Sequence, residues 1–183
     1  MKDSEEELLA RARAFEEKGL VEVYDRFSPE IFRYAMRFLG SPDQAEECVS
    51  ETFRRFLEAL KKGKGPRSYL RAYLYRTAHN WVTDFYRRQP LADLPLEPNL
   101  HADPEGDPSR SVAIELERQE VRRALLSLTS EQRQVIVLKY LEDWSNQEVA
   151  KALEKPVGAV KSLQHRALNA LRRALVEPTE ETR

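Results

Sequence analysis

Cysteine, glycine and long apolar runs are scarce in this chain of 183 residues, which contains one cysteine and six glycines. The single thiol, Cys48, excludes intrachain disulfides, zinc ribbons and Cys-x-x-Cys redox motifs. No apolar run approaches the roughly 20 residues that cross a bilayer. The first residues, Met1 to Glu7, are acidic where a secretory signal would be basic and then apolar. We therefore expect a cytoplasmic protein without membrane insertion.

Catalytic and metal-binding motifs are also missing. The three histidines, His79, His101 and His165, lie in separate segments without Glu or Cys at metal-ligand spacing, and no glycine-rich phosphate loop follows a strand. The sequence therefore favours a protein that is not an enzyme and needs no cofactor. Cys48 lies near the apolar stripe of a predicted helix, so we expect a partly buried small residue rather than a thiol sensor.

Charge is nearly balanced overall, at a formal net charge of -1, but it is distributed unevenly. Residues 54–88 carry ten basic side chains against two acidic ones, residues 89–120 carry two against eight, and residues 121–176 carry ten against five. Two basic blocks around an acidic connector indicate two contacts with a polyanion, because Lys and Arg neutralise phosphates. Solvated helix faces are the alternative interpretation.

Proline divides the chain. Five of the ten prolines lie between Gln89 and Ser109, among acidic residues. A segment so rich in proline cannot continue a helix or a strand. We predict an all-α protein of two small domains, residues 1–88 and 112–176, joined by a flexible acidic linker over 89–111. Residues 177–183 are expected to form a disordered tail.

The helix signals of the first domain are mainly Ser-Pro pairs. Ser28-Pro29 and Ser41-Pro42 predict two helix starts, the second with a capping box that Gln44 completes. Pro66 predicts the start of a third helix with a buried stripe of Leu70, Leu74, Ala78, Trp81 and Phe85. The side chains expected to face outward from it are Arg71, Tyr75, Arg76, His79, Asn80, Thr83, Arg87 and Arg88.

The second domain has the spacing of a helix-turn-helix. Capping boxes at Thr129–Gln132 and Ser145–Glu148 predict helices over 130–140 and 146–153, and a further helix is predicted over 157–176. This last helix contains no acidic residue from Gly158 onward. Its inward stripe is predicted to be Val160, Leu163, Ala167, Leu171 and Ala174. Its outward face, predicted to enter a major groove, comprises Lys161, Ser162, His165, Asn169, Arg172 and Arg173.

The order of several short motifs resembles a known family. Tyr24-Asp25-Arg26-Phe27, then Ser41-Pro42-Asp43-Gln44-Ala45-Glu46-Glu47, then Tyr73-Leu74-Tyr75-Arg76 resemble region two of bacterial sigma factors. Glu131-Gln132-Arg133, Tyr140-Leu141-Glu142 and Gly158-Ala159-Val160-Lys161-Ser162 resemble region four. With only these two regions, the chain resembles the extracytoplasmic-function (ECF) group of the sigma-70 family.

The resemblance implies a protein that binds core RNA polymerase, at the largest-subunit clamp helices and the flap, and directs it to promoter DNA. It also allows for an anti-sigma factor as a partner. The implied minus-ten DNA-binding residues, including a loop over 61–68 that would capture a flipped base, are Lys62, Lys64, Arg67, Arg76, His79, Asn80, Arg87 and Arg88. The implied minus-thirty-five DNA-binding residues are Lys155, Lys161, Ser162, His165, Arg166 and Arg172. The implied polymerase-binding residues are Asp43, Glu46, Glu47 and Glu51.

Two other functions stay open at this point. A stand-alone helix-turn-helix regulator that binds DNA as a dimer would explain the second domain but not the first. A helical scaffold or anti-regulator that binds only protein would leave the acid-free helix unexplained. Two departures from the family also matter: Glu154 stands where glycine is frequent, and Leu163-Gln164 stands where Arg-Leu is frequent, so the usual arginine contact is not carried over.

Overall fold

The structure, a computed structural model, describes residues 4–88 and 108–176, and every regular element in those ranges is a helix. This confirms the all-α prediction. The chain divides into two compact units, one of residues 1–89 with 151–154 and the other of residues 90–150 with 155–183. Each unit is described by itself, and α7, which this division crosses, is described with the second. Within the described ranges, no helix combines the length and the apolar character that crossing a bilayer requires.

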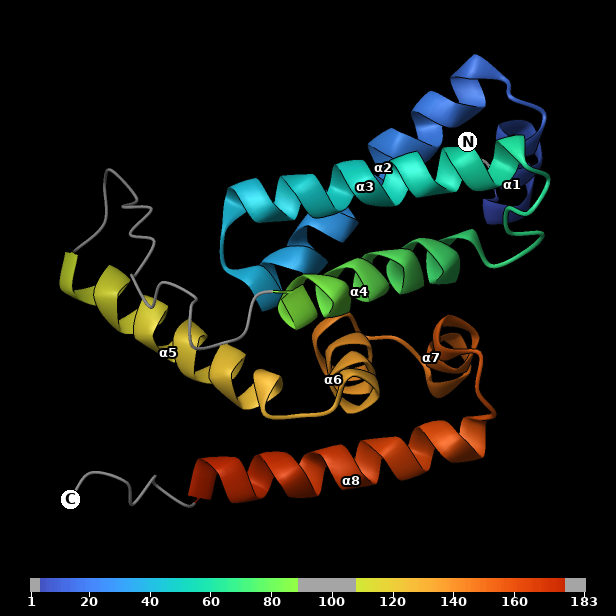
Figure 1. The fold of residues 1–183 in the computed structure, drawn as a ribbon. Coiled ribbons are helices and arrows are strands. Elements are labelled where there is room, and N and C mark those ends of the chain that lie inside the picture. The colour runs from blue at the N-terminus through green and yellow to red at the C-terminus, as the bar shows by residue number, and fades with distance from the viewer. Residues whose placement is uncertain (1–3, 89–107, 177–183) are drawn as a thin grey trace. The chain divides into compact units, whose positions relative to one another are not determined.

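Four helices form the first unit: α1 (Glu5–Arg13), α2 (Glu17–Leu39), α3 (Pro42–Lys61) and α4 (Leu70–Arg88). In Figure 1, α2, α3 and α4 lie alongside one another, and α1 packs on α2 and α4. Helix α1 begins at a reciprocal capping box between Ser4 and Glu7, and Leu8, Leu9 and Ala12 bury its inner face. The core therefore lies among all four helices.

Helix α2 does not begin where the sequence predicts. It starts at Glu17 and continues through Pro29, so the prediction of a helix start at Pro29 is wrong. An internal proline weakens a helix because it lacks an N–H and its ring crowds the preceding turn. Here, Val23, Phe27 and Ile31 are buried at helical spacing on both sides of the proline. Their burial outweighs the local cost.

The next two helix starts follow the local signals only in part. Pro42 is the first residue of α3, as predicted, after Gly40 ends α2 with a φ of 69°. The predicted capping box is wrong, because the Ser41 side chain makes no capping hydrogen bond. Helix α4 begins at Leu70 rather than at Pro66, since Tyr69 has a φ of 54° and cannot continue a right-handed helix.

The second unit contains α5 (Pro108–Leu126), α6 (Ser130–Ile136), the π-helical turn η2 (Val137–Leu141), α7 (Asn146–Leu153) and α8 (Val157–Val176). Reciprocal bonds between Thr129 and Gln132 and between Ser145 and Glu148 confirm both predicted capping boxes. The helix predicted over 130–140 is α6 followed by η2. The predicted bounds of α7 and α8 are confirmed.

Arg133 joins α5 to α6 through its buried guanidinium group. It donates hydrogen bonds to the carbonyl oxygens of Leu125, Leu126 and Leu128, at 2.9, 3.2 and 3.0 Å. The last carbonyls of a helix have no partner within it, and a cation is favourable at that end. Arg133 therefore fixes the end of α5 against α6.

The predicted linker and tail fall mostly outside the described residues, which omit 89–107 and 177–183. Helix α5 begins at Pro108, four residues before the domain boundary that the sequence suggested. A proline is tolerated at the first position of a helix because the N–H that it lacks has no helical partner there.

Candidate nucleic-acid and polymerase interfaces

The outward face of α8 is as the sequence predicts. Val160, Leu163 and Ala167 are buried. The five predicted minus-thirty-five residues on this helix are exposed, namely Lys161, Ser162, His165, Arg166 and Arg172. Burial of the inward stripe decreases toward the end of α8, where Leu171 is half-buried and Ala174 is exposed. The prediction that Ala174 faces inward is therefore wrong. The helix thus presents a continuous acid-free polar face over its first turns.

Local contacts orient several side chains on α8. Ser162 Oγ donates to the Gly158 carbonyl oxygen at 3.1 Å, and His165 Nδ1 lies 3.3 Å from Asn169 Nδ2. The Gln164 amide donates to the Tyr140 hydroxyl oxygen at 2.6 Å and so ties α8 to η2. The sequence did not predict this contact, because no local pattern links positions in separate elements.

The turn before α8 holds two further predicted features. Glu154 adopts a φ of 52°, the left-handed conformation that explains why glycine is frequent at this place. Lys155 is half-buried, and its ammonium group lies 2.9 Å from a Glu131 carboxylate oxygen. Its charge is therefore partly compensated within the unit, unlike the exposed cations on α8.

Helix α4 contradicts part of the predicted minus-ten surface. The prediction that Tyr75 and His79 face outward is wrong, because they are only 0% and 3% exposed. His79 Nδ1 shares a 2.8 Å hydrogen bond with the Tyr34 hydroxyl group, and the Tyr75 ring packs edge-on against Tyr34. Because α4 packs against α1, α2 and α3, more of its circumference is buried than the single stripe of side chains that the sequence predicted. His79 is therefore removed from the candidate surface.

The exposed edge of α4 is smaller but still basic. Asn80, Arg87 and Arg88 are exposed, and Arg76 is half-buried with its guanidinium carbon 5.6 Å from the centre of the Tyr73 ring. Arg87 pairs with Asp84 at 3.0 Å. The candidate minus-ten residues of this helix are thus Arg76, Asn80, Arg87 and Arg88.

The loop between α3 and α4 presents the remaining minus-ten candidates. Lys62, Lys64 and Arg67 are all exposed. Gly63 has a φ of 67°, and a Cβ atom on Gly65 would lie 2.5 Å from Leu60 Cδ2. The two glycines therefore allow the chain to turn back closely over the end of α3, as their place in the loop suggests.

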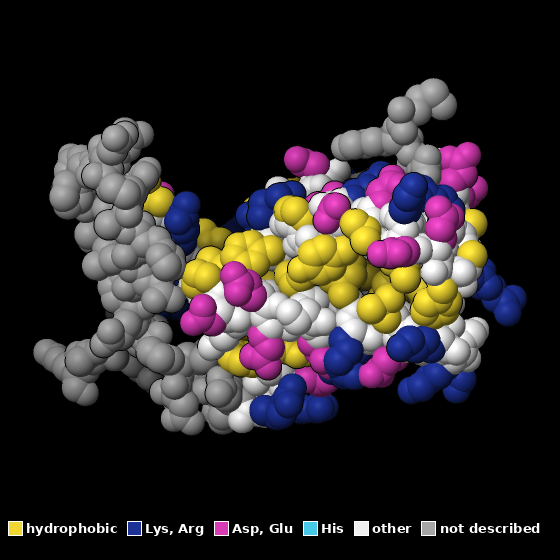
Figure 2. All heavy atoms as spheres, turned by 90° about the horizontal axis from the view of Figure 1, so that it is seen from above, with side chains coloured by type: hydrophobic (Ala, Val, Ile, Leu, Met, Phe, Trp, Pro, Cys, Tyr) yellow, Lys and Arg dark blue, Asp and Glu magenta, His cyan; other side chains and the backbone are white. Residues whose placement is uncertain are grey.

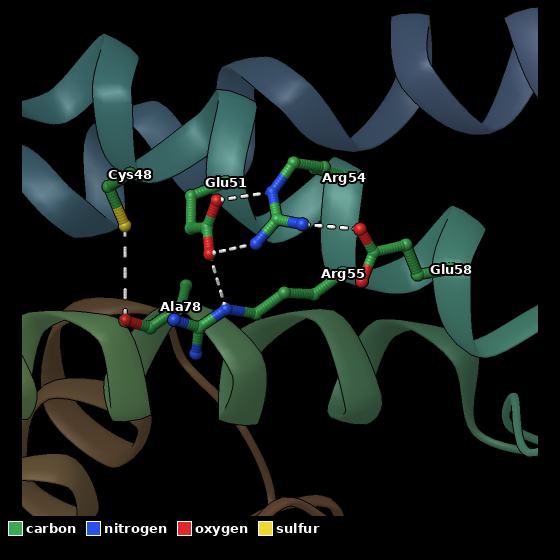
Figure 3. Close-up of polar contacts among 6 residues, drawn as sticks. All are labelled: Cys48, Glu51, Arg54, Arg55, Glu58 and Ala78. Atoms are coloured by element: carbon green, nitrogen blue, oxygen red, sulfur yellow. Dashed lines mark hydrogen bonds and ion pairs between the residues drawn. The ribbon is translucent and has the colours of Figure 1, made fainter.

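The four predicted polymerase-binding carboxylates of α3 fall into two groups. Asp43, Glu46 and Glu47 are exposed, whereas Glu51 accepts hydrogen bonds from Arg54 and Arg55, each at 2.7 Å (Figure 3). The hydrogen bond from Arg54 is the main cause that lowers the pKa of Glu51 to about 2. The negative charge of Glu51 is thus already compensated on its own helix, and the other three carboxylates form the open acidic face.

Cys48 lies on the opposite side of α3 from that acidic face. It is buried, and its thiol donates to the Ala78 carbonyl oxygen at 3.8 Å (Figure 3). Burial raises the pKa of the Cys48 thiol to about 12. A thiol of such a high pKa forms little thiolate, the reactive species, so this residue acts as a core contact.

An exposed apolar surface near the acidic face was missed from the sequence. Val21 and Tyr24 on α2 are 52% and 49% exposed, and the Tyr24 ring lies 4.9 Å from that of Phe53 on α3. Figure 2 shows apolar side chains gathered between acidic and basic ones on this face of the first unit. Glu46 and Phe53 are seven residues apart, so they share one side of α3. Carboxylates and an apolar surface therefore lie on one face.

Comparison with known families accounts for both units. Residues 23–90 match "Sigma-70 region 2", and residues 118–171 match "Sigma-70, region 4". ECF RNA polymerase sigma factor SigL of Mycobacterium tuberculosis is 32% identical over 155 residues, which cover 85% of this chain and 88% of that protein. The chain belongs to the ECF group of the sigma-70 family. Since region 2 has no place in a stand-alone helix-turn-helix regulator, this sigma factor is not one.

Other relatives of this ECF sigma factor agree with the assignment. ECF RNA polymerase sigma factor BldN of Streptomyces coelicolor is 30% identical over 171 residues, which cover 92% of this chain but only 65% of BldN. Among solved structures, CnrH in complex with the cytosolic domain of CnrY has a TM-score of 0.71 and 25% identity, and the match covers 95% of this chain and 98% of CnrH. Regions 2 and 4 correspond to the first and second units.

Proposed function

We propose that this ECF sigma factor directs core RNA polymerase to promoters by reading the minus-thirty-five element with α8 and opening the minus-ten element with α4 and the 61–68 loop. It acts as an initiation factor in the cytoplasm and not as an enzyme. The observation that carries the proposal is the exposed acid-free face of α8 in the same chain as a basic region 2 loop. A protein that bound DNA through only one of these surfaces would have no use for the second.

Polymerase binding is assigned to the first unit. Asp43, Glu46 and Glu47 are exposed on α3, and Val21 and Tyr24 add exposed apolar area on α2. An apolar centre bordered by charge is typical of protein interfaces. We therefore expect this face to meet the clamp helices of the polymerase largest subunit. An anti-sigma factor that occupied the same face would compete with polymerase.

DNA binding is divided between the two units. On α8, Lys161, Ser162 and His165 lie in the N-terminal half, which a recognition helix points at base edges, whereas Arg172 lies farther along and is assigned to a phosphate. In region 2, Asn80 and Arg76 are assigned to the separated strands, with Lys62, Lys64 and Arg67 on the phosphates. Their charges supply the salt-dependent part of the affinity.

The test is reconstitution with core polymerase. The full chain should co-elute with the core enzyme on gel filtration, and the mixture should produce specific transcripts from fragmented genomic DNA. Glu46→Lys combined with Glu47→Lys should weaken co-elution, whereas Lys161→Ala should leave co-elution intact and reduce transcripts. Binding of DNA by the chain alone, with no association with the core enzyme, would contradict the proposal.

A further inference from the structure

His165 and Asn169 form a hydrogen-bonded pair near the middle of the exposed face of α8. Asn169 Nδ2 lies 3.3 Å from His165 Nδ1. Residues four apart lie on one face of a helix, and this face is roughly opposite the buried Val160, Leu163 and Ala167. His165 is exposed and Asn169 is half-buried. The pair therefore lies on the side of α8 that is assigned to DNA.

The atoms in this contact determine which ring nitrogen of His165 carries hydrogen. An amide nitrogen only donates hydrogen bonds, so His165 Nδ1 is the acceptor. The neutral ring then has its hydrogen on Nε2, because the bond made by one ring nitrogen sets the state of the other. Nε2 is the ring nitrogen farther from the helix backbone, and no described residue accepts a hydrogen bond from it. The outer end of the side chain is thus an open donor.

The fold of α8 gives no reason for an asparagine at position 169. Asparagine favours a helix less than alanine does, because its side chain competes for backbone hydrogen bonds. Asn169 lies in neither the first nor the last turn of α8, so it caps no helix end. A single exposed pair of side chains four residues apart adds little to the stability of a helix. The contact with His165 therefore suits a role outside the fold.

The charged side chains around the pair are positive. Helix α8 contains no acidic residue from Gly158 onward, and Lys161 and Arg172 are exposed before and after the pair. Such cations attract phosphates whatever the base sequence is. The pair between them is uncharged and has a directional donor, which suits a base edge rather than a phosphate.

We propose that Asn169 is a positioning residue that holds the His165 ring so that Nε2–H donates to N7 of a guanine in the minus-thirty-five element. The inference rests on the proposed function and deepens it by naming the base. In the major groove, guanine N7 stands beside a second acceptor, O6, whereas adenine N7 stands beside an amino donor. Cytosine presents an amino donor, and thymine a methyl group beside its acceptor. A side chain that donates from its outer end therefore selects guanine.

The experiment uses holoenzyme reconstituted with core polymerase and a promoter fragment recovered by transcription on genomic DNA. Each guanine of the minus-thirty-five element, on either strand, is replaced in turn by 7-deazaguanine, which lacks the N7 acceptor. At one guanine, the replacement should weaken binding of the parent about fivefold and leave binding of His165→Ala unchanged, because both changes remove one contact. Arg172→Ala, which removes a phosphate contact, should respond to the replacement as the parent does.

Asn169→Ala tests the positioning role. It should weaken binding about threefold because the ring is free to rotate, and this loss should disappear when His165 is already alanine. The variant should melt at or above the temperature of the parent, since alanine is the better helix former. Nitrogen NMR of the full chain provides a direct readout: the His165 signals should show hydrogen on Nε2 and an acceptor at Nδ1.

The outcomes separate this inference from the proposed function. Failure of the parent holoenzyme to bind the fragment would overturn the proposed function itself. If the parent binds but every guanine replacement affects parent and His165→Ala alike, or if His165 carries its hydrogen on Nδ1, the guanine contact is overturned and the sigma-factor assignment stands. Additive losses for His165→Ala and Asn169→Ala, or an Asn169→Ala variant that melts well below the parent, would overturn the positioning role.

Discussion

Helices α4 and α8 are similar in length, with 19 and 20 residues, and both carry basic side chains, but their neighbours differ. Helix α4 packs against α1, α2 and α3, whereas α8 packs against α5 and α6. Two of the polar or aromatic side chains expected at the surface of α4, Tyr75 and His79, are buried, while the polar face of α8 stays exposed. The neighbours of a helix thus decide how many of its polar residues can meet a ligand.

The largest expected effect tests the difference between α4 and α8 through the free energy of unfolding. Tyr75→Ala should lower the free energy of unfolding by about 3–5 kcal/mol, because the side chain is fully buried and a cavity would remain. His165→Ala on exposed α8 should change it by less than about 0.5 kcal/mol. Urea unfolding of both full-length variants measures the difference. Similar midpoints would mean that the core of the first unit does not depend on α4 as described.

The next prediction tests whether the exposed edge of α4 still acts on DNA. Asn80→Ala should leave polymerase association within about twofold of the parent and reduce open-complex formation, because a lost base contact costs about 1–3 kcal/mol. Permanganate reactivity of unpaired thymines measures the open complex. Arg33→Ala, an exposed change on α2, serves as the control. Open-complex yields equal to the parent would remove Asn80 from the candidate surface.

A third prediction divides α8 along its length. Lys161→Ala and His165→Ala should change the preference among single-base variants of the minus-thirty-five element, by about 1 kcal/mol or more at one position. Arg172→Ala should weaken all variants alike and lower the salt slope by about one. Holoenzyme binding would be measured at several salt concentrations. A uniform loss for Lys161 and His165 would mean that both side chains hold phosphates.

The smallest effect concerns the buried polar contact beneath α4. Tyr34→Phe removes the hydroxyl group that shares a hydrogen bond with His79 Nδ1 and should lower the free energy of unfolding by about 1 kcal/mol. Transcription should stay close to that of the parent, because both residues are buried. Thermal unfolding and a run-off assay provide the two measurements. A strong loss of transcription without loss of stability would return His79 to the candidate site.

Several features of the fold and candidate site were determined by sequence alone because their physics is local. A serine or threonine and its partner three residues later form the capping boxes at Thr129 and Ser145 within one turn. The apolar period and the absence of acidic residues likewise marked the inner and outer faces of α8. The order of the region 2 and region 4 motifs was sufficient to indicate the family.

Tertiary structure decided the features that depend on distant partners. Pro29 lies inside α2 because buried side chains on both sides of it keep the helix continuous. His79 is inside because Tyr34, 45 residues away, supplies its hydrogen bond. Tyr69 holds a strained φ beside contacts from α1 and α2. The sequence shows which residues favour a helix and which carry a charge, but packing between helices determines which of them reach the surface.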